Sequence, residues 1–282
     1  MDSAEGIAQA LAEAWKPTFA VAPVIDVEKA KTYLAENASA LDFSTFVVPD
    51  SVSFEQILSK MQHFAPGPDG IPFAAWKAAG PVGHRALAAM LRHALSGRDA
   101  HSTFNDSIIV FIPKGDEEDD IINGAVRKPQ DTRPFSLKNT DNKFICCLIN
   151  YATKHILTAG ISHLQRGFVP KRQLLANVVE LDAMSHAYAI AAPGSAIPML
   201  VLFDFAAAFP SISHEWLFLT LHAMQFPIGF INFIHMMYKD NHAYYNSQGC
   251  SSLLFQIRRS STLSALRHAV RLRNKPIFTT DA

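Results

Sequence analysis

One carboxylate, Asp204, lies inside an otherwise apolar run that extends from Val201 to Ser213. Burying an ionised carboxylate costs several kcal/mol unless a cation or hydrogen bonds compensate the charge. A metal ion is one candidate for this partner, because hard divalent cations bind carboxylate oxygens. The run therefore predicts a site at which a carboxylate meets a cation.

The residues on either side of Asp204 predict how it is presented. Residues 199–203 are bulky and apolar, are too few for a helix, and follow two prolines and a glycine, a pattern typical of a buried strand. Ser213 then precedes a helical pattern and is expected to be its N-cap. Asp204 is therefore expected at the C-terminal end of a buried strand, where active-site carboxylates are often presented.

Other catalytic arrangements lack the necessary spacing. The twelve histidines are scattered, and no His-Glu-x-x-His or Cys/His zinc spacing occurs. His214 and His222 are expected at or near the surface rather than as metal ligands. Ser211 and Ser213 lack the glycines of a nucleophile elbow, which argues against a hydrolase. Three cysteines, two of them adjacent, form neither a disulfide framework nor a Cys-x-x-Cys site and fit a reducing compartment.

Composition indicates a globular protein. With 282 residues, 49 % of them hydrophobic, the chain can bury a sizeable core in one large or two small domains. Residues 1–6 are acidic where a targeting peptide would be basic, and no apolar run approaches the roughly 18 residues that span a bilayer. We expect a soluble, intracellular protein without a membrane partner.

The net charge of zero hides a segregation of charge along the sequence. Residues 127–172 hold nine Lys or Arg against two Asp, and residues 254–282 hold six against one, so the rest of the chain carries a net charge of −12. A basic centre between acidic segments is compatible with a groove that faces phosphates. A solvated basic face without a partner is about as common, so charge alone does not decide between them.

Loops and strands before Asp204 supply further polar groups. Two prolines and two glycines between Pro66 and Gly70 demand tight turns. A β-branched strand over residues 107–114 ends with Lys114, and a second extended segment begins with Arg133. A long helix is expected to start at Asn139.

Four further helices are predicted from apolar periodicity. Residues 3–15 form an amphipathic helix that Pro17 is expected to stop, and residues 216–226 and 228–239 form two apolar helices. Residues 174–191 predict a helix whose buried positions are Leu174, Val178, Leu181, Met184 and Tyr188.

Five short motifs occur in a characteristic order. They are APGPDGIP over residues 65–72, IPKG over 112–115, RPFSL with NTDNK over 133–143, QRGF over 165–168, and FDFAAAF over 203–209. In this order the chain closely resembles the reverse transcriptases (RNA-directed DNA polymerases) of non-LTR retrotransposons. The resemblance implies an α+β right-hand polymerase fold, helix-rich, consisting of fingers and a partial palm with an incomplete antiparallel palm sheet.

The resemblance also implies roles for individual residues. Asp204 and the backbone carbonyl of Phe205 would bind Mg²⁺, which activates the primer 3′-hydroxyl and neutralises the leaving pyrophosphate. Phe209 resembles the steric gate that excludes a ribose 2′-hydroxyl, and it can be a core ring at the same time. Lys114 and Arg133 would bind the triphosphate, Arg133 in bidentate fashion.

The partners implied are an RNA template, a DNA primer and deoxynucleotide triphosphates. Template contacts would come from the first glycine-rich loop and from the basic loop after the long helix, with seven residues in all. These template-binding residues are Gly67, Asp69, Gly70, Gln165, Gly167, Phe168 and Arg172.

The sequence departs from the family pattern after Asp204. The glycine-rich R-Q-G-C-P-L-S motif and the Y/F-A-D-D hairpin do not occur, and the later acidic residues are only Glu215, Asp240 and Asp281. Two-metal catalysis needs more than one carboxylate, so we expect the isolated chain to be unable to polymerise. Lys171 also stands where the family usually has glycine.

The division of the chain follows from these motifs. Residues 1–50 are an unassigned helical extension, 51–195 are fingers-like, 196–257 are a partial palm, and 258–282 are a basic tail that a frameshift or a wrongly assigned exon could have introduced. The expected function is that of a reverse transcriptase fragment. A non-catalytic RNA-binding remnant is the main alternative, and a helical protein-interaction module would explain the helices but not the ordered motifs.

Overall fold

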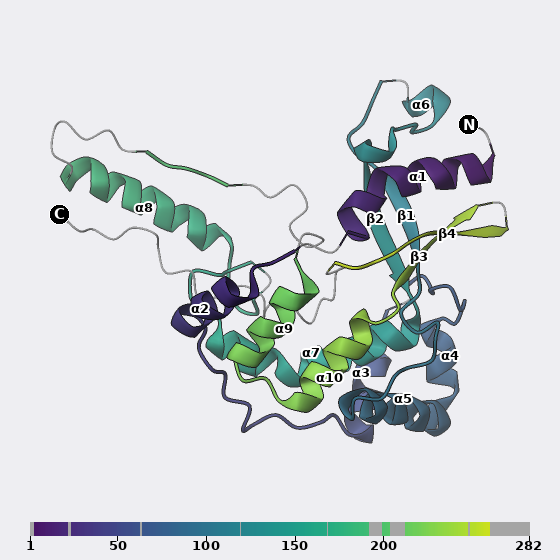
Figure 1. The fold of residues 1–282 in the computed structure, drawn as a ribbon, viewed down its shortest axis with the longest axis horizontal. Coiled ribbons are helices and arrows are strands. Elements are labelled where there is room, and N and C mark those ends of the chain that lie inside the picture. The colour runs from purple at the N-terminus through teal and green to yellow at the C-terminus, as the bar shows by residue number, and fades with distance from the viewer. Residues whose placement is uncertain are drawn as a thin grey trace.

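The computed structural model describes residues 3–21, 24–62, 64–118, 120–167, 169–191, 199–203, 212–247 and 249–259. A layer of helices lies against one end of a four-stranded sheet, and the predicted α+β class is confirmed (Figure 1). The helices are α1 Ala4–Phe19, α2 Val27–Asn37, α3 Ser51–Lys60, α4 Phe73–Ala78, α5 Gly80–Leu95, α6 Asp120–Asn123, the 3₁₀ turn η1 Pro129–Asp131, α7 Thr140–Gly160, α8 Leu175–Ala191, α9 His214–Ala223 and α10 Ile228–Tyr238. No described helix has the length and apolarity that crossing a membrane requires.

The sheet joins segments that lie more than a hundred residues apart. Its strands are β1 Ser107–Pro113, β2 Thr132–Lys138, β3 His242–Ser247 and β4 Cys250–Gln256, in the order β2-β1-β3-β4. The hairpins β1–β2 and β3–β4 are antiparallel, whereas β1 and β3 pair in parallel. The described sheet is thus mixed rather than antiparallel, because the helices between β2 and β3 return the chain to the same end of the sheet.

Helix α1 covers one face of this sheet (Figure 1). The Phe19 ring stacks on Phe255 at a centroid distance of 5.7 Å, and Trp15 lies 6.5 Å from Phe111. The prediction that Pro17 stops the helix is wrong, since α1 continues to Phe19. The Pro17 nitrogen cannot donate to the Glu13 carbonyl, and the packing of Trp15 and Phe19 on the sheet offsets this single lost hydrogen bond.

The helical layer buries most of the apolar core. Helix α7 contributes Phe144, Leu148 and Ile149, all fully buried, and α10 packs against α5 across the same core. Ser213 accepts a hydrogen bond from the Trp216 amide at 3.3 Å and is the N-cap of α9, as predicted.

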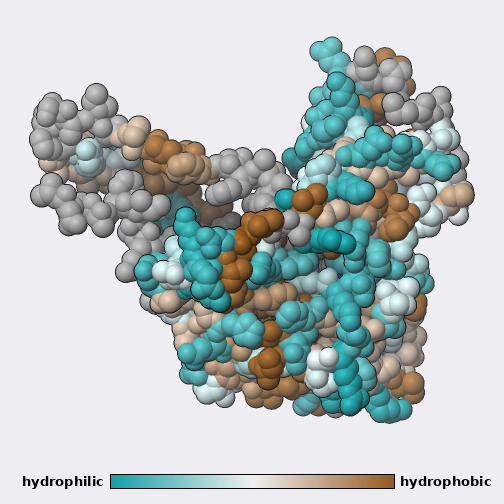
Figure 2. Space-filling model, viewed as in Figure 1, coloured by the Kyte–Doolittle hydropathy of each residue, from teal (hydrophilic) through white to brown (hydrophobic). Residues whose placement is uncertain are grey.

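Helix α8 and residues 199–203 contradict the expected burial. None of the five side chains predicted to face inward along 174–191 is buried. The five side chains of residues 199–203 are 52–84 % exposed. Residues 199–203 also lack strand pairing. Figure 2 shows the resulting apolar surface on α8, which projects from the molecule. Apolar sequence predicted burial here, but no described segment packs on these side chains.

Candidate nucleic-acid interface

Lys114 and Arg133 lie side by side at one end of the sheet. Pro113 pairs with Thr132 and Ile112 with Arg133, so the end of β1 adjoins the start of β2. The Lys114 ammonium donates to the carbonyl of Gln130 at 2.8 Å. The exposed Arg133 guanidinium makes no hydrogen bond or ion pair within the described part of the chain. The structure therefore brings together the two cations that the sequence placed 19 residues apart.

Arg133 shares its sheet face with apolar and aromatic side chains. Strand alternation places it with Val110, Ile112 and Phe135, which are 42 %, 48 % and 57 % exposed, on the face opposite α1. Leu253 of β4, 58 % exposed, follows on the same face by its pairing with Tyr244. This open sheet face combines aliphatic side chains and the Phe135 ring with a cation, a composition on which an unpaired base can stack and a phosphate can bind.

A buried arginine holds the loop that follows Lys114. The Arg127 side chain is 3 % exposed and donates to both carboxylate oxygens of Asp120 at 2.6 and 2.7 Å. It also donates to the carbonyls of Lys114 and Gly115 at 3.2 and 3.1 Å. The hydrogen bonds from Arg127 lower the pKa of Asp120 to about 2. Arg127 was counted in the basic centre, but its charge is compensated within the loop.

The glycine-rich loop 66–70 packs directly on the start of α7. The Gly70 amide donates to the Gly67 carbonyl at 3.1 Å, and Gly70 has φ +68°. A Cβ on Gly67 would lie 2.3 Å from the Asn139 nitrogen, so only glycine permits this approach. The Asp69 amide donates to Asn139 Oδ1 at 3.2 Å. The loop is thus fixed in place by the residue that was predicted to start the helix.

Asn139 occupies the N-cap position but does not cap the helix with its side chain. Its amide instead links the loop to Thr103, whose carbonyl accepts from Nδ2 at 3.3 Å. Thr140 Oγ1 donates to the Ile71 carbonyl at 2.7 Å and accepts from the Trp76 indole at 3.0 Å. Side chains at the start of α7 therefore hold both ends of the loop and its following helix.

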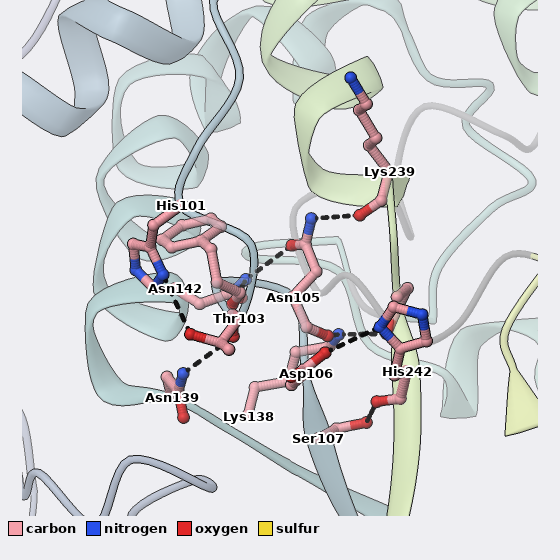
Figure 3. Close-up of polar contacts among 12 residues, drawn as sticks. His101, Thr103, Asn105, Asp106, Ser107, Lys138, Asn139, Asn142, Lys239 and His242 are labelled. Carbon is pink, nitrogen blue, oxygen red and sulfur yellow. Dashed lines mark hydrogen bonds and ion pairs between the residues drawn. The ribbon is translucent and has the colours of Figure 1, made fainter. Parts of the chain in front are cut away.

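A buried polar junction lies beneath these contacts (Figure 3). The Lys138 ammonium donates to the Asn105 carbonyl at 2.6 Å and to Asn241 Oδ1 at 2.7 Å. Asn105 Nδ2 donates to the carbonyls of Met236 and Lys239 at 2.6 and 2.7 Å, at the end of α10. Burial lowers the pKa of Lys138 to about 8. Sequence reasoning missed this junction, whose members pair across more than thirty residues.

Two acid and imidazole pairs border the junction. His242 Nδ1 lies 3.1 Å from Asp106 Oδ1, and His101 Nε2 lies 3.7 Å from Asp141 Oδ2. Burial raises the pKa of the Asp141 carboxyl, and its neighbour His101 opposes that shift. Both pairs join β1 and the turn before it to neighbouring elements, and neither contains a further carboxylate.

The basic loop after α7 is organised by Arg172. Its guanidinium donates to four carbonyls at the end of α7 and just beyond it, from Thr158, Ile161, Ser162 and Gln165, at 2.5–3.2 Å. These bonds cap a helix C-terminus, where a cation is favourable. The contact of Arg172 with a template stays a prediction.

The two predicted template loops lie at opposite ends of α7. The helix has 21 residues and spans about 30 Å at 1.5 Å per residue. Gly67, Asp69 and Gly70 lie at its start, while Gln165, Gly167 and Arg172 follow its end. A nucleic acid that contacts both loops would therefore extend along this helix.

The predicted catalytic residues lie outside the described residues. These are Asp204, Phe205 and Phe209, and Phe168 of the basic loop lies outside as well. Within the described ranges, no group of three or more His, Cys, Asp or Glu side chains could hold a metal ion. The described residues thus provide no magnesium site, and Mg²⁺ binding at Asp204 stays a prediction.

A transposon protein is similar to this chain. The similarity is 28 % identity over 188 residues with the uncharacterized 149 kDa protein of transposon TX1 from Xenopus laevis. It covers 65 % of this chain and 13 % of the transposon protein, so the chain spans a small part of that relative's length. A comparison with protein-family profiles finds no match.

Proposed function

We propose that this chain is the fingers and first part of the palm of a retrotransposon-type reverse transcriptase, and that it binds template RNA without polymerising. The observation that carries the proposal is the position of Lys114 and Arg133 at the adjoining ends of β1 and β2, beside an open sheet face. The five ordered motifs and the similarity to a transposon protein support it.

Phosphate binding at the sheet follows from the free guanidinium. Arg133 presents parallel N–H donors that match two oxygens of a phosphate group, in a nucleotide triphosphate or in the RNA backbone, and no described group competes for them. Lys114 adds a second positive charge beside it, and its present partner is only a carbonyl. The exposed Phe135 ring offers a surface on which a template base can stack.

The template backbone would follow the loop 66–70. Its turn presents Asp69 and Gly70 outward on the rigid start of α7, and the residues that hold it are buried or half-buried. A loop fixed in this way can position a strand through its backbone without reading the sequence, as a polymerase requires.

Nucleotidyl transfer would require groups beyond those that the sequence contains. Asp204 and the Phe205 carbonyl would hold Mg²⁺, which supplies activation of the primer hydroxyl when it is bound. No pair of adjacent acidic residues follows Asp204 in the sequence. The apolar side chains of α8 and of residues 199–203 are exposed, which supports the proposal that further protein segments must pack on them to complete the palm.

Two assays on the full chain test this proposal. Binding of single-stranded RNA should weaken steeply with salt, and Arg133→Met should lower affinity and reduce the salt slope by about one. Arg85→Met is the matched control, because Arg85 is an exposed arginine of α5, away from the sheet face. Equal loss of affinity in both variants would contradict a specific sheet site.

Primer extension with Mg²⁺ and deoxynucleotides tests the proposal that the isolated chain does not polymerise. We expect no extension by the isolated chain. Extension that Asp204→Ala abolishes would refute the view that the carboxylate is isolated, and would assign polymerase activity to the chain itself.

A further inference from the structure

A polar cavity lies away from the sheet face. Its volume is about 460 Å³, it is open to solvent on one side, and it is lined by the turn after α5 and by helices α9 and α10. None of its lining residues belongs to β1, β2 or the loop 66–70. This α5–α9–α10 cavity therefore differs from the surface proposed above to bind template and nucleotide.

The charges around the cavity leave one cation uncompensated. Lys239 Nζ donates to Asp99 Oδ2 at 2.5 Å, so these two charges neutralise one another. The exposed Arg98 guanidinium has no hydrogen bond or ion pair among the residues that the structure describes. The lining residues thus carry a net positive charge of one, with the Asp240 carboxylate acting on Lys239 from outside the lining, and an anion would find a free guanidinium at the wall.

Two imidazoles and an aromatic ring line the same space. The ring of Phe218 stacks on His235 with centroids 3.6 Å apart and planes 4° from parallel. His214 lies 4.4 Å from the Tyr238 ring, and its Nε2 atom is buried without a hydrogen-bond partner among the described residues. The cavity therefore offers aromatic rings beside one imidazole nitrogen, His214 Nε2, whose hydrogen-bonding capacity is unused within the described residues.

The walls of the cavity are fixed by contacts outside it. Gly97 has φ +78°, and a Cβ there would lie 3.1 Å from the Asn232 side chain, so the turn after α5 approaches α10 closely. Asn105 holds the carbonyls of Met236 and Lys239, which anchors the end of α10 to the buried junction (Figure 3). A cavity with such supports loses little conformational freedom when it is filled.

We propose that the α5–α9–α10 cavity binds a phosphate monoester, with Arg98, Lys239 and His235 as donors to its oxygens and Phe218 against its organic group. Donors from two different segments match an anion with three peripheral oxygens better than a carboxylate with two. The volume lies within the range of small-molecule sites.

Calorimetric titration of the full chain tests this site with phenyl phosphate, inorganic phosphate and benzoate. Phenyl phosphate should bind saturably and more tightly than the other two. Arg98→Met should weaken it about tenfold or more, because a charged hydrogen bond is lost. His235→Gln, at an exposed position, should weaken it less. Melting curves establish that each variant is folded.

Two control variants locate the anion. Arg92→Met removes another exposed arginine from α5, and Arg133→Met removes the sheet cation; neither should change the affinity for phenyl phosphate. Equal weakening by Arg92→Met would mean general charge attraction, and loss of binding in Arg133→Met would place the anion on the sheet. Either result, or benzoate binding as tightly as phenyl phosphate, would overturn the proposal.

Discussion

Lys138 should make the stability of this protein depend on pH in the alkaline range. Its ammonium is surrounded by protein, and burial lowers its pKa from 10.5 to about 8. Above pH 8 the folded chain loses this proton while the unfolded chain keeps it, so stability rises with pH until about 10.5. A difference of 2.5 pKa units between the folded and unfolded chain raises the free energy of unfolding by about 3 kcal/mol between pH 8 and 10.5, with a slope of no more than about 1.4 kcal/mol per pH unit.

Lys138→Met isolates this effect. The variant gains stability because it removes a buried charge, and it loses stability because the Asn105 carbonyl and Asn241 Oδ1 are left without their donor. Each effect is about 1–3 kcal/mol, so the stability of the variant at pH 7 should be similar to or below that of the wild type. The pH dependence is the decisive measurement. Urea unfolding followed by tryptophan fluorescence at pH 7.5, 8.25 and 9 should show a rise for the wild type and none for the variant.

Comparison of the two proteins cancels the titrations of groups that do not interact with Lys138, but Cys146 does interact with it. Burial also raises the pKa of Cys146 to about 12, so that thiol lowers stability above its ordinary value of 9.0, in the opposite direction. Measurements up to pH 9 largely avoid this contribution. Identical pH profiles for wild type and Lys138→Met would refute the reasoning, because they would mean that the Lys138 ammonium is as well solvated in the folded as in the unfolded chain.

Two further predictions concern the loops at the candidate interface. Gly67→Ala should destabilise the fold by about 1–3 kcal/mol and weaken RNA binding, since its Cβ would lie 2.3 Å from a backbone nitrogen of the adjoining helix. Gly167→Ala is the control in urea unfolding, because its Cβ would meet only Gln165 Nε2 at 3.7 Å. Arg127→Met should speed proteolysis of residues 114–127 at pH 6. That difference in proteolysis rate should fade as the pH falls from 3.8 through 2, because the Asp120 carboxylate becomes protonated and no longer binds Arg127 as an anion. A difference that is unchanged at pH 2 would refute the role of Asp120.

Elements with local signals could be predicted from the sequence. Strand β1 follows from a β-branched run, and α9 from the Ser213 N-cap; both occur where expected. The two extended segments that hold Lys114 and Arg133 were also predicted, but their pairing across the long connection that contains α6 and η1 has no short turn signal, and only the family resemblance placed both cations at one nucleotide site. The signals for β1 and α9, in contrast, each lie within a few residues of the feature that they predict.

Features that depend on distant partners could not be predicted. The apolar residues of α8 and 199–203 indicated burial, yet burial requires a surface to pack on, and the described chain has none there. Asn139 looked like a helix cap, but its amide contacts a loop seventy residues earlier. Lys138 stood in a strand as an ordinary cation, and only the fold shows that Asn105 and Asn241 surround it.

The polar junction explains how the candidate interface can be rigid although its parts come from distant segments. The loop 66–70 is held by Asn139, which follows Lys138, and Lys138 is held by Asn105, which also binds the end of α10. Apolar contacts would tolerate small shifts among these elements, whereas hydrogen bonds of 2.6–2.7 Å require one geometry. The buried Lys138 ammonium destabilises the fold at neutral pH, yet it lies where the sheet, the template loop and the helical layer must keep a fixed relative position.

Lys138→Met should therefore loosen loop 66–70 even where it leaves the global stability unchanged. Hydrogen exchange at the Asp69 and Gly70 amides measures this directly, and unchanged protection there would limit the role of Lys138 to stability alone.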